Sequence, residues 1–278
     1  MEIKDIRIRD PYVYLDKETG LYYIYGTTNL LEGLRAGDKF HCYTSYDLIH
    51  FDGPFVIFDS KKEGFWGTQD FWAAELHKYN NRFYLIGSAY STNHKRASQI
   101  FIGDTPLGPF KVLGEVPQTV NEWECLDGTL YFEDNIPYLV FCHEWLECGV
   151  GEIWAVELSN DLSKKVGEPF MLFKASDNKF TRSIKEDRDA YVTDGPFLFK
   201  EDNKLKMIWS SFVEGNRYVV LEATSTSIKG KWEHSSPRFD FDGGHAMIFV
   251  DKNGKRFISL HSPNTPPNER MKFIPFDE

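Results

Sequence analysis

The hydrophobic positions of this chain fall into short runs that come in pairs. The clearest pair begins at Asp194, where an acidic residue is followed by an apolar run, a polar turn at 201–204 and a second apolar run that ends at Ser211. Two β-rich runs on either side of a few turn residues are typical of a β-hairpin. Because no long stretch shows the period of an amphipathic helix, the pattern predicts an all-β protein.

The same hairpin pattern occurs five times. Its first residues are Asp10, Glu75, Asp127, Asp194 and His245, so the spacings are 65, 52, 67 and 51 residues. Strand-and-turn repeats of this length indicate a propeller. Gly-Pro or Gly-Lys-Trp endings recur at 53–54, 108–109 and 230–232, downstream of the hairpins, which indicates that each repeat is a four-stranded blade. We therefore expect one domain over residues 1–278, a five-bladed β-propeller with antiparallel blades at about 7–60, 61–118, 119–175, 176–235 and 236–278.

Equivalent strands of a propeller surround one central channel, so the five first residues of the repeats should converge there. Four of these residues are carboxylates and the fifth is a histidine. Unpaired buried carboxylates are too costly to serve as packing. Two carboxyl groups, one protonated and one ionised, can hydrolyse a glycosidic bond, and a third can raise the pKa of the acid. The competing interpretation is a site for a hard cation such as calcium.

Two further stretches could contribute to this pocket. Trp66, Phe71 and Trp72 come just before Glu75 and could form a stacking wall for a sugar ring, or they could pack between blades. Glu144 follows the second strand of the third hairpin, where it could reach the pocket or remain a solvated charge at the edge. We keep both interpretations for each stretch.

Composition narrows the class of partner. The formal net charge is −10 and is dispersed along the chain, which argues against nucleic acid or an anionic membrane surface and is compatible with a neutral carbohydrate. No apolar run is long enough for a membrane span. The N-terminus has no apolar signal core, so we expect either a cytoplasmic protein or a secreted one whose leader has been removed.

Cysteine usage gives no sign of a metal centre. Cys42, Cys125, Cys142 and Cys148 have no zinc-like spacing, so we expect free buried thiols, with a Cys142–Cys148 bridge left open. The sequence predicts no organic cofactor.

Five motifs, in order along nearly the whole chain, carry a resemblance to a known family. They are Arg9-Asp10-Pro11, Trp72-Ala-Ala-Glu75-Leu-His77, Leu126-Asp127-Gly128, Thr193-Asp194-Gly-Pro196 and Gly243-Gly-His245. Together they resemble the glycoside hydrolase family 43 propellers, the arabinanase, arabinofuranosidase and xylosidase group. The resemblance implies an inverting hydrolase of arabinose- or xylose-containing plant glycans.

The resemblance also implies roles for individual residues. Asp10 matches the general base, and Asp127 matches the carboxylate that orients the acid and tunes its pKa. The slot of the general acid, usually Glu in that family, holds Asp194. The shorter side chain could withdraw the proton by about 1 Å, enough to matter for a positioned catalyst, so Glu144 and then Glu124 are our substitutes. His245 matches a histidine near a central ion, often calcium.

Two other functions stay open. A retaining fructan- or sucrose-type hydrolase is suggested by Trp123-Glu-Cys125, which faintly resembles the acid motif of that group, although Arg9 stands where the group has Asn. A carbohydrate-binding propeller without catalysis is suggested by the Glu-to-Asp change at Asp194.

Overall fold

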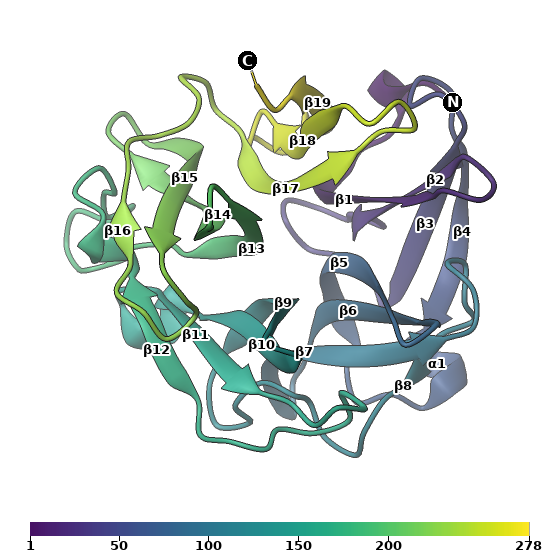
Figure 1. The fold of residues 1–278 in the computed structure, drawn as a ribbon, viewed down its shortest axis with the longest axis horizontal. Coiled ribbons are helices and arrows are strands. Elements are labelled where there is room, and N and C mark those ends of the chain that lie inside the picture. Colours follow the sequence, from purple (N-terminus) through teal and green to yellow (C-terminus); the bar gives the residue numbers. More distant parts are fainter. Residues whose placement is uncertain (278) are drawn as a thin grey trace.

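The computed structural model describes residues 1–277. Five antiparallel sheets surround a central channel, and the two termini lie in neighbouring blades (Figure 1). The first two sheets contain β1 (Arg9–Asp16), β2 (Leu21–Thr27), β3 (Lys39–Ser45) and β4 (Asp52–Asp59), then β5 (Gln69–Tyr79), β6 (Arg82–Ser91), β7 (His94–Gly103) and β8 (Lys111–Val112). The next two contain β9 (Cys125–Glu133), β10 (Ile136–His143), β11 (Glu152–Glu157) and β12 (Phe170–Lys174), then β13 (Asp194–Glu201), β14 (Lys204–Val213), β15 (Arg217–Ser225) and β16 (Glu233–His234). The last contains β17 (Gly244–Val250), β18 (Arg256–Ser262) and β19 (Arg270–Pro275).

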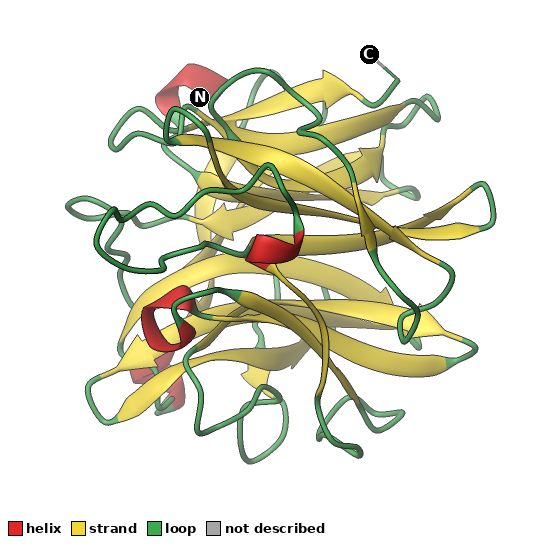
Figure 2. Ribbon diagram, turned by 90° about the vertical axis from the view of Figure 1, so that its left-hand side faces the viewer, coloured by secondary structure: helices red, strands yellow, loops and turns green. Residues whose placement is uncertain are grey.

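The predicted five-bladed all-β propeller is confirmed, and each sheet lies inside its predicted range. Within residues 1–277 the fifth sheet has three strands and the other four have four. Helices are short, and strands dominate the side view (Figure 2); they are η1 (Ile3–Asp5), α1 (Ser60–Glu63), α2 (Trp145–Cys148) and η2 (Ala175–Asp177). None of the helices within residues 1–277 has the length and apolar character that a membrane span requires.

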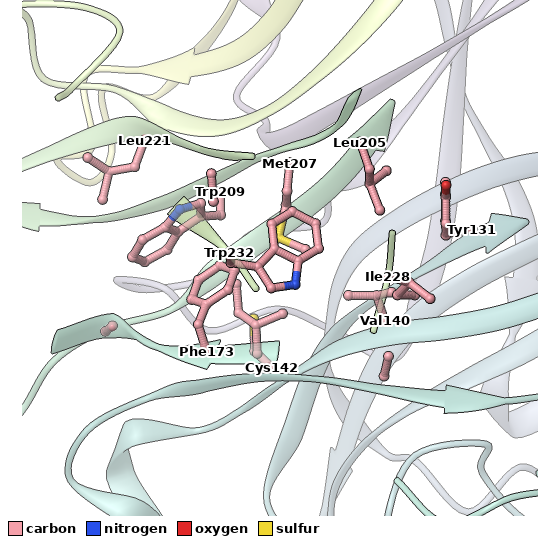
Figure 3. Packing of buried hydrophobic residues seen from close by; sticks show 14 of the residues in the cluster. Tyr131, Val140, Cys142, Phe173, Leu205, Met207, Trp209, Leu221, Ile228 and Trp232 are labelled. Atoms are coloured by element: carbon pink, nitrogen blue, oxygen red, sulfur yellow. The ribbon is translucent and has the colours of Figure 1, made fainter. Parts of the chain in front are cut away.

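The hydrophobic core lies between adjacent blades. Between the third and fourth blades, Trp209 and Trp232 pack with Phe173 and Met207 against Cys142 (Figure 3). Strands buried on both faces carry nearly continuous apolar runs rather than strict alternation, as β10 does. All four cysteines are free, as predicted, although Cys148 is only half-buried.

Buried ion pairs join the first and last blades. Glu269 is fully buried, and its carboxylate meets Arg7 Nε at 3.0 Å and Arg9 at 3.3 Å. Burial alone would raise the pKa of Glu269, but the hydrogen bond and charges of the two arginines outweigh it and hold the pKa below its ordinary value. A buried carboxylate with two cationic partners thus closes the ring.

A two-residue β-bulge interrupts the inner strand of every blade. The pairing is broken after Arg9, Trp72, Leu126, Asp194 and Gly244 and resumes three residues later. The first unpaired residue always has a positive φ between 47° and 55°; these residues are Asp10, Ala73, Asp127, Gly195 and His245. Bulges redirect side chains and are common next to active sites. These five residues are therefore the structurally equivalent positions around the channel.

This equivalence corrects the predicted alignment in two blades. Glu75 lies two residues after the bulge residue Ala73 and so corresponds to Tyr12, while Asp194 precedes Gly195 and corresponds to Arg9. The sequence alignment matched acidic residues at the head of apolar runs. A bulge changes which residue points toward the channel but leaves the following apolar run unchanged. An alignment of apolar runs therefore cannot detect the bulge.

We expect Ala73→Gly to stabilise the protein. A left-handed backbone costs an L-residue about 1–2 kcal/mol and costs glycine almost nothing, whereas Ala73 has a φ of 47°. Glycine loses more chain entropy than alanine when the protein folds, which offsets part of this benefit. We therefore expect a net gain of about 0.5–1 kcal/mol in the free energy of unfolding. Denaturant titration measures it.

The neighbouring Ala74→Gly is the matched control. Ala74 is fully buried but is not among the residues with positive φ, so the same change should destabilise by about 1 kcal/mol. Equal losses from both substitutions would contradict the strain that we assign to the bulge.

Candidate active site

A cavity of about 270 Å³ lies over the channel and receives residues from every blade. Six of the residues predicted from the sequence line it, namely Asp10, Trp72, Asp127, Glu144, Asp194 and His245. In the first four blades these residues lie at or next to the bulges of β1, β5, β9 and β13, and in the fifth blade they lie on β17. Glu144 is the exception, because it follows the end of β10. The cavity is near the smaller end of the range typical of small-molecule sites.

Hydrogen bonds between blades hold the bulges in place. In four blades the N–H of the bulge residue donates to a side chain on the second strand of the preceding blade. The four bonds are Ala73 to Thr27 Oγ1 (2.8 Å), Asp127 to Ser88 Oγ (2.9 Å), His245 to Ser210 Oγ (2.7 Å) and Asp10 to His261 Nδ1 (3.2 Å). These acceptors are themselves equivalent, since each pairs with the residue just before its own bulge.

The third blade departs from this pattern. Its equivalent residue is Cys142, which pairs with Leu126. The N–H of Gly195 instead donates to Asp127 Oδ2 at 2.9 Å. Gly195 has a φ of 52°, and an added Cβ would lie within 3 Å of the ring of His245. Only glycine therefore lets this backbone reach the carboxylate beside the histidine.

Asp10 is an ionised carboxylate. His245 Nδ1 lies 3.1 Å from its Oδ1, and the Thr27 hydroxyl donates to its Oδ2. Burial would raise its pKa, but the charge and hydrogen bond of His245, with Arg9 nearby, hold the pKa of Asp10 well below its ordinary value. Asp10 is thus available as a base at any neutral or mildly acidic pH.

The two histidines next to Asp10 have opposite charge states. Burial opposes protonation of His245, but Asp10 and Asp127 outweigh it and raise its pKa to about 10. Burial and the charge of Arg9 lower the pKa of His261 to about 3. Neutral His261 accepts from the backbone N–H of Asp10 through Nδ1, so its Nε2–H donates to Asn264 Oδ1 at 3.0 Å.

Asp127 and Asp194 share the remaining negative charge of the cavity. Burial raises the pKa of both, and their nearby carboxylates raise it further against the attraction of His245. Tyr218 donates its hydroxyl proton to Asp194 Oδ2 at 2.9 Å. Two interacting carboxyl groups titrate as a pair, and the negative charge of Asp194 raises the pKa of Asp127.

Glu144 is the third carboxyl group with a raised pKa. It follows β10, its backbone N–H donates to Glu124 O at 2.8 Å, and its side chain is buried. Burial and the negative charge of Asp194 raise its pKa to about 8, against the attraction of Arg96. At pH 7 the cavity therefore contains a protonated Glu144 together with an ionised Asp10.

Trp72 forms one wall of the cavity. The guanidinium carbon of Arg96 lies 3.7 Å from the centre of its ring, a cation–π contact. Arg96 is held by Asp70, whose Oδ2 lies 3.6 Å from the Nη2 of Arg96. The indole Nε1 of Trp72 is buried and lacks a hydrogen-bond partner among residues 1–277.

Four other predicted residues do not line this cavity. Phe71 is 1% exposed and packs on Phe40 between blades, because its alternate neighbour Trp72 takes the inward position. Trp66 stacks on His94 with 4.1 Å between ring centres. Glu75 lies deeper in the channel and pairs with His77 at 2.8 Å. Glu124 accepts from the backbone N–H of Arg96 at 2.9 Å.

Sequence reasoning assigned no role to several residues of the site. Arg9, Tyr218 and Asn264 line the cavity, and Thr27 and His261 hold Asp10. Thr27 and His261 could have been found from the repeat, since they occupy equivalent places on second strands. Tyr218 could not, because its hydrogen bond to Asp194 joins β15 to β13 across the intervening strand β14.

The residues do not fit a calcium ion bound directly to His245. Its Nδ1 already pairs with Asp10 at 3.1 Å and lies 3.7 Å from Asp127, so this nitrogen is engaged by carboxylates on the side that faces the cavity. The imidazolium itself supplies the positive charge between the carboxylates. Within residues 1–277, one group of possible metal ligands converges elsewhere, at His143, Cys148 and Glu152. There Glu152 already pairs with Lys174 and His143, both at 3.1 Å.

Buried carboxyl groups in opposite protonation states around one cavity are the arrangement that glycosidases use. The comparisons with known proteins agree with this class. The sequence model of glycosyl hydrolases family 43 matches residues 3–274. The chain belongs to this family.

Three solved structures illustrate the similarity of this chain to known enzymes. An endo-arabinase from Bacteroides thetaiotaomicron VPI-5482 is 37% identical, with a TM-score of 0.91, and the match covers 99% of this chain and 96% of that one. An endo-1,4-beta-xylanase from the same organism is 26% identical, with a TM-score of 0.74 and coverages of 96% and 89%. An alpha-L-arabinofuranosidase from Lactobacillus brevis is 17% identical, with a TM-score of 0.73 and coverages of 99% and 94%, and shares the fold. No curated protein matches the chain in the sequence comparison.

The protonation of Glu144 predicts a pH dependence of stability. Its pKa rises from an ordinary 4.5 to about 8 on folding, so the fold favours the protonated form. That contribution is complete below about pH 4.5 and is lost as the pH rises through 8. Glu144→Gln, which is neutral at every pH, should remove roughly 3 kcal/mol or more of the decline in unfolding free energy between pH 5 and 9.

Denaturant titrations at several pH values measure this difference. Glu122→Gln, at an exposed residue close by, is the control and should follow the parent protein. Parallel pH profiles for the parent and Glu144→Gln would contradict the raised pKa.

Proposed function

We propose that this protein is an inverting hydrolase of arabinose- or xylose-containing glycans, with Asp10 as general base and Glu144 as general acid. One observation carries the proposal: the same cavity holds a carboxylate whose pKa is lowered and a carboxyl group whose pKa is raised to about 8. A base must be ionised and an acid protonated at the working pH, and here both conditions are met near neutrality.

In the proposed reaction, Asp10 takes a proton from a water molecule while the oxygen of that water molecule bonds to the anomeric carbon. Glu144 gives its proton to the departing glycosidic oxygen as the bond from that oxygen to the anomeric carbon breaks. The products are a sugar of inverted configuration and a free hydroxyl on the leaving group. Solvent then returns the proton from Asp10 to Glu144. His245 and Thr27 keep Asp10 oriented and ionised.

Asp127 and Asp194 assist as neighbouring charges in this proposal. The carboxylate of Asp194 is the second largest cause of the raised pKa of Glu144, after burial, and Asp127 adds to it. Asp194 accepts a hydrogen bond from Tyr218, which favours its ionised form. Glu144 is also the longer side chain. These observations favour Glu144 over Asp194 as the acid, although Asp194 occupies the acid slot of the family motif.

Arabinan-type substrates are the first choice. The similarity at 37% identity and nearly full coverage to an endo-arabinase supports them, and the more distant endo-1,4-beta-xylanase makes xylan-type substrates the second choice. Trp72 supplies an aromatic wall of the kind that sugar rings stack against. The retaining fructan-type alternative loses its acid, because Glu124 lies outside the cavity and binds the backbone of Arg96.

Leaving-group dependence tests the assignment of the acid. We expect Glu144→Gln to lower kcat/KM on an unactivated arabino-oligosaccharide by about 10²–10⁴-fold. On a 2,4-dinitrophenyl glycoside, whose leaving group needs no proton, the loss should be less than tenfold. Asp194→Asn should lower both rates by a similar factor, and the basic limb of its pH profile should move to lower pH, since the pKa of Glu144 falls without the neighbouring charge.

The opposite pattern would assign the acid to Asp194. In that case Asp194→Asn would lose activity on the oligosaccharide alone, and Glu144→Gln would retain it. Binding without turnover by the parent protein would instead favour a carbohydrate-binding propeller.

The stereochemical outcome tests the mechanism. Proton NMR of the first product released from the oligosaccharide should show the inverted anomer before mutarotation. Activity of the parent protein should fall above about pH 8, as Glu144 loses its proton. First release of the retained anomer would rule out Asp10 acting through water.

A further inference from the structure

The side chains that line the catalytic cavity are polar at its floor and apolar at its mouth. Its floor consists of buried or half-buried polar groups, among them Asp10, Asp127 and Glu144. Its mouth is apolar and becomes exposed outward. We call Leu34, Trp145, Leu146, Ile184 and Phe212 the collar; all five line the cavity, and Leu34 and Leu146 are 46% and 61% exposed.

The collar is assembled from separate segments. Leu34 belongs to the segment between β2 and β3, Trp145 and Leu146 to α2, Ile184 to the segment between β12 and β13, and Phe212 to β14. Single exposed leucines are common on protein surfaces. The collar is different, because five apolar side chains from four segments meet at one cavity. A continuous apolar patch of this kind marks a binding surface.

Hydrogen bonds fix the two segments that carry the exposed leucines. The Arg7 guanidinium donates to Leu31 O at 3.1 Å and to Gly33 O at 2.7 Å, just before Leu34. Glu147 on α2 accepts from the backbone N–H of Glu124 at 2.7 Å and lies 3.0 Å from His143 Nε2. A collar held in this way loses little freedom when a ligand binds.

The chemistry of the collar defines what it can hold. Sugar hydroxyls that leave water need hydrogen-bonding partners, and the five collar residues offer mainly carbon surface. Only the indole N–H of Trp145 is polar among their side-chain atoms. The flat rings of Trp145 and Phe212 suit an aromatic group, since aromatic pairs gain from offset or edge contacts.

We propose that the collar is a subsite for an aromatic ring carried by the leaving group. The inference rests on the proposed hydrolase function, because the glycosyl unit that reacts must occupy the acidic floor and the departing group must then extend through the mouth. The ring can be the aglycone itself or an aromatic acyl ester on the departing sugar.

Methyl, benzyl and 2-naphthylmethyl glycosides of the sugar that the enzyme accepts test the subsite. Their alcohols differ little in acidity, so differences report ring binding rather than leaving-group chemistry. Burying a phenyl ring predicts a kcat/KM about tenfold higher for benzyl than for methyl glycoside. An oligosaccharide with and without an aromatic ester on its departing unit forms the second arm and distinguishes the two sources of the ring.

Variants of the exposed leucines give the matched controls. Leu34→Asn and Leu146→Asn should each lower the benzyl-to-methyl ratio of kcat/KM at least threefold, because the ratio cancels any effect of the substitution that the two glycosides share. Leu31→Asn changes an exposed leucine of the same segment that does not line the cavity, and it should leave the ratio unchanged. Calorimetry with the same glycosides measures the ratio of affinities even where no bond is broken.

The failure of this inference is distinct from that of the proposed function. A benzyl-to-methyl ratio near one in both rate and affinity, or a ratio that the collar variants leave unchanged, overturns the aromatic subsite and leaves the hydrolase intact. Absence of turnover on every glycoside counts against the hydrolase, and the affinity ratio then decides the subsite alone.

Discussion

The structure depends on one repeated hydrogen bond, in which the N–H of a bulge residue donates to a side chain on the second strand of the preceding blade. The bulge leaves this N–H without a partner in its own sheet, and a buried N–H without an acceptor is costly. Thr27, Ser88, Ser210 and His261 supply the acceptors. The same bond therefore orders neighbouring blades around the axis and aims each bulge residue at the channel.

The active chemistry arises where this pattern is broken. In the third blade the place of the acceptor is taken by Cys142, and the N–H of Gly195 turns to the carboxylate of Asp127. Asp127 is thereby drawn to within 3.7 Å of His245, which also contacts Asp10 at 3.1 Å. One imidazolium then pairs with two carboxylates, while burial and the charge of Asp194 raise the pKa of Glu144 against the attraction of Arg96. The charge states of the acids therefore differ because each acid has a different set of charged neighbours.

The sequence predicted much of this arrangement because acidic residues or a histidine stand at the start of each repeated hairpin. The sequence names Asp10, Asp127, Asp194, Glu144 and His245 as candidates, and all five line the cavity. Glu75 was misplaced because its blade carries Ala73 at the bulge, and no acidic residue marks that position. Trp66, Phe71 and Trp72 were predicted as candidates for one wall, and only Trp72 lines the cavity. Strand alternation around a bulge decides between Phe71 and Trp72, and the apolar pattern does not reveal the bulge.

The sequence by itself determined the number of blades, their approximate limits and three acids of one cavity, Asp10, Asp127 and Asp194, because hydrophobic alternation and turn chemistry are local properties of the chain. The tertiary structure alone decided the register at each bulge, the pairing of Glu269 with Arg7 and Arg9, and the charge of each carboxyl group and histidine. A pKa in a buried site depends on distances to groups that lie far apart in sequence, such as His245 and Asp10. Those distances are set by the packing of whole blades, so no local pattern can specify them.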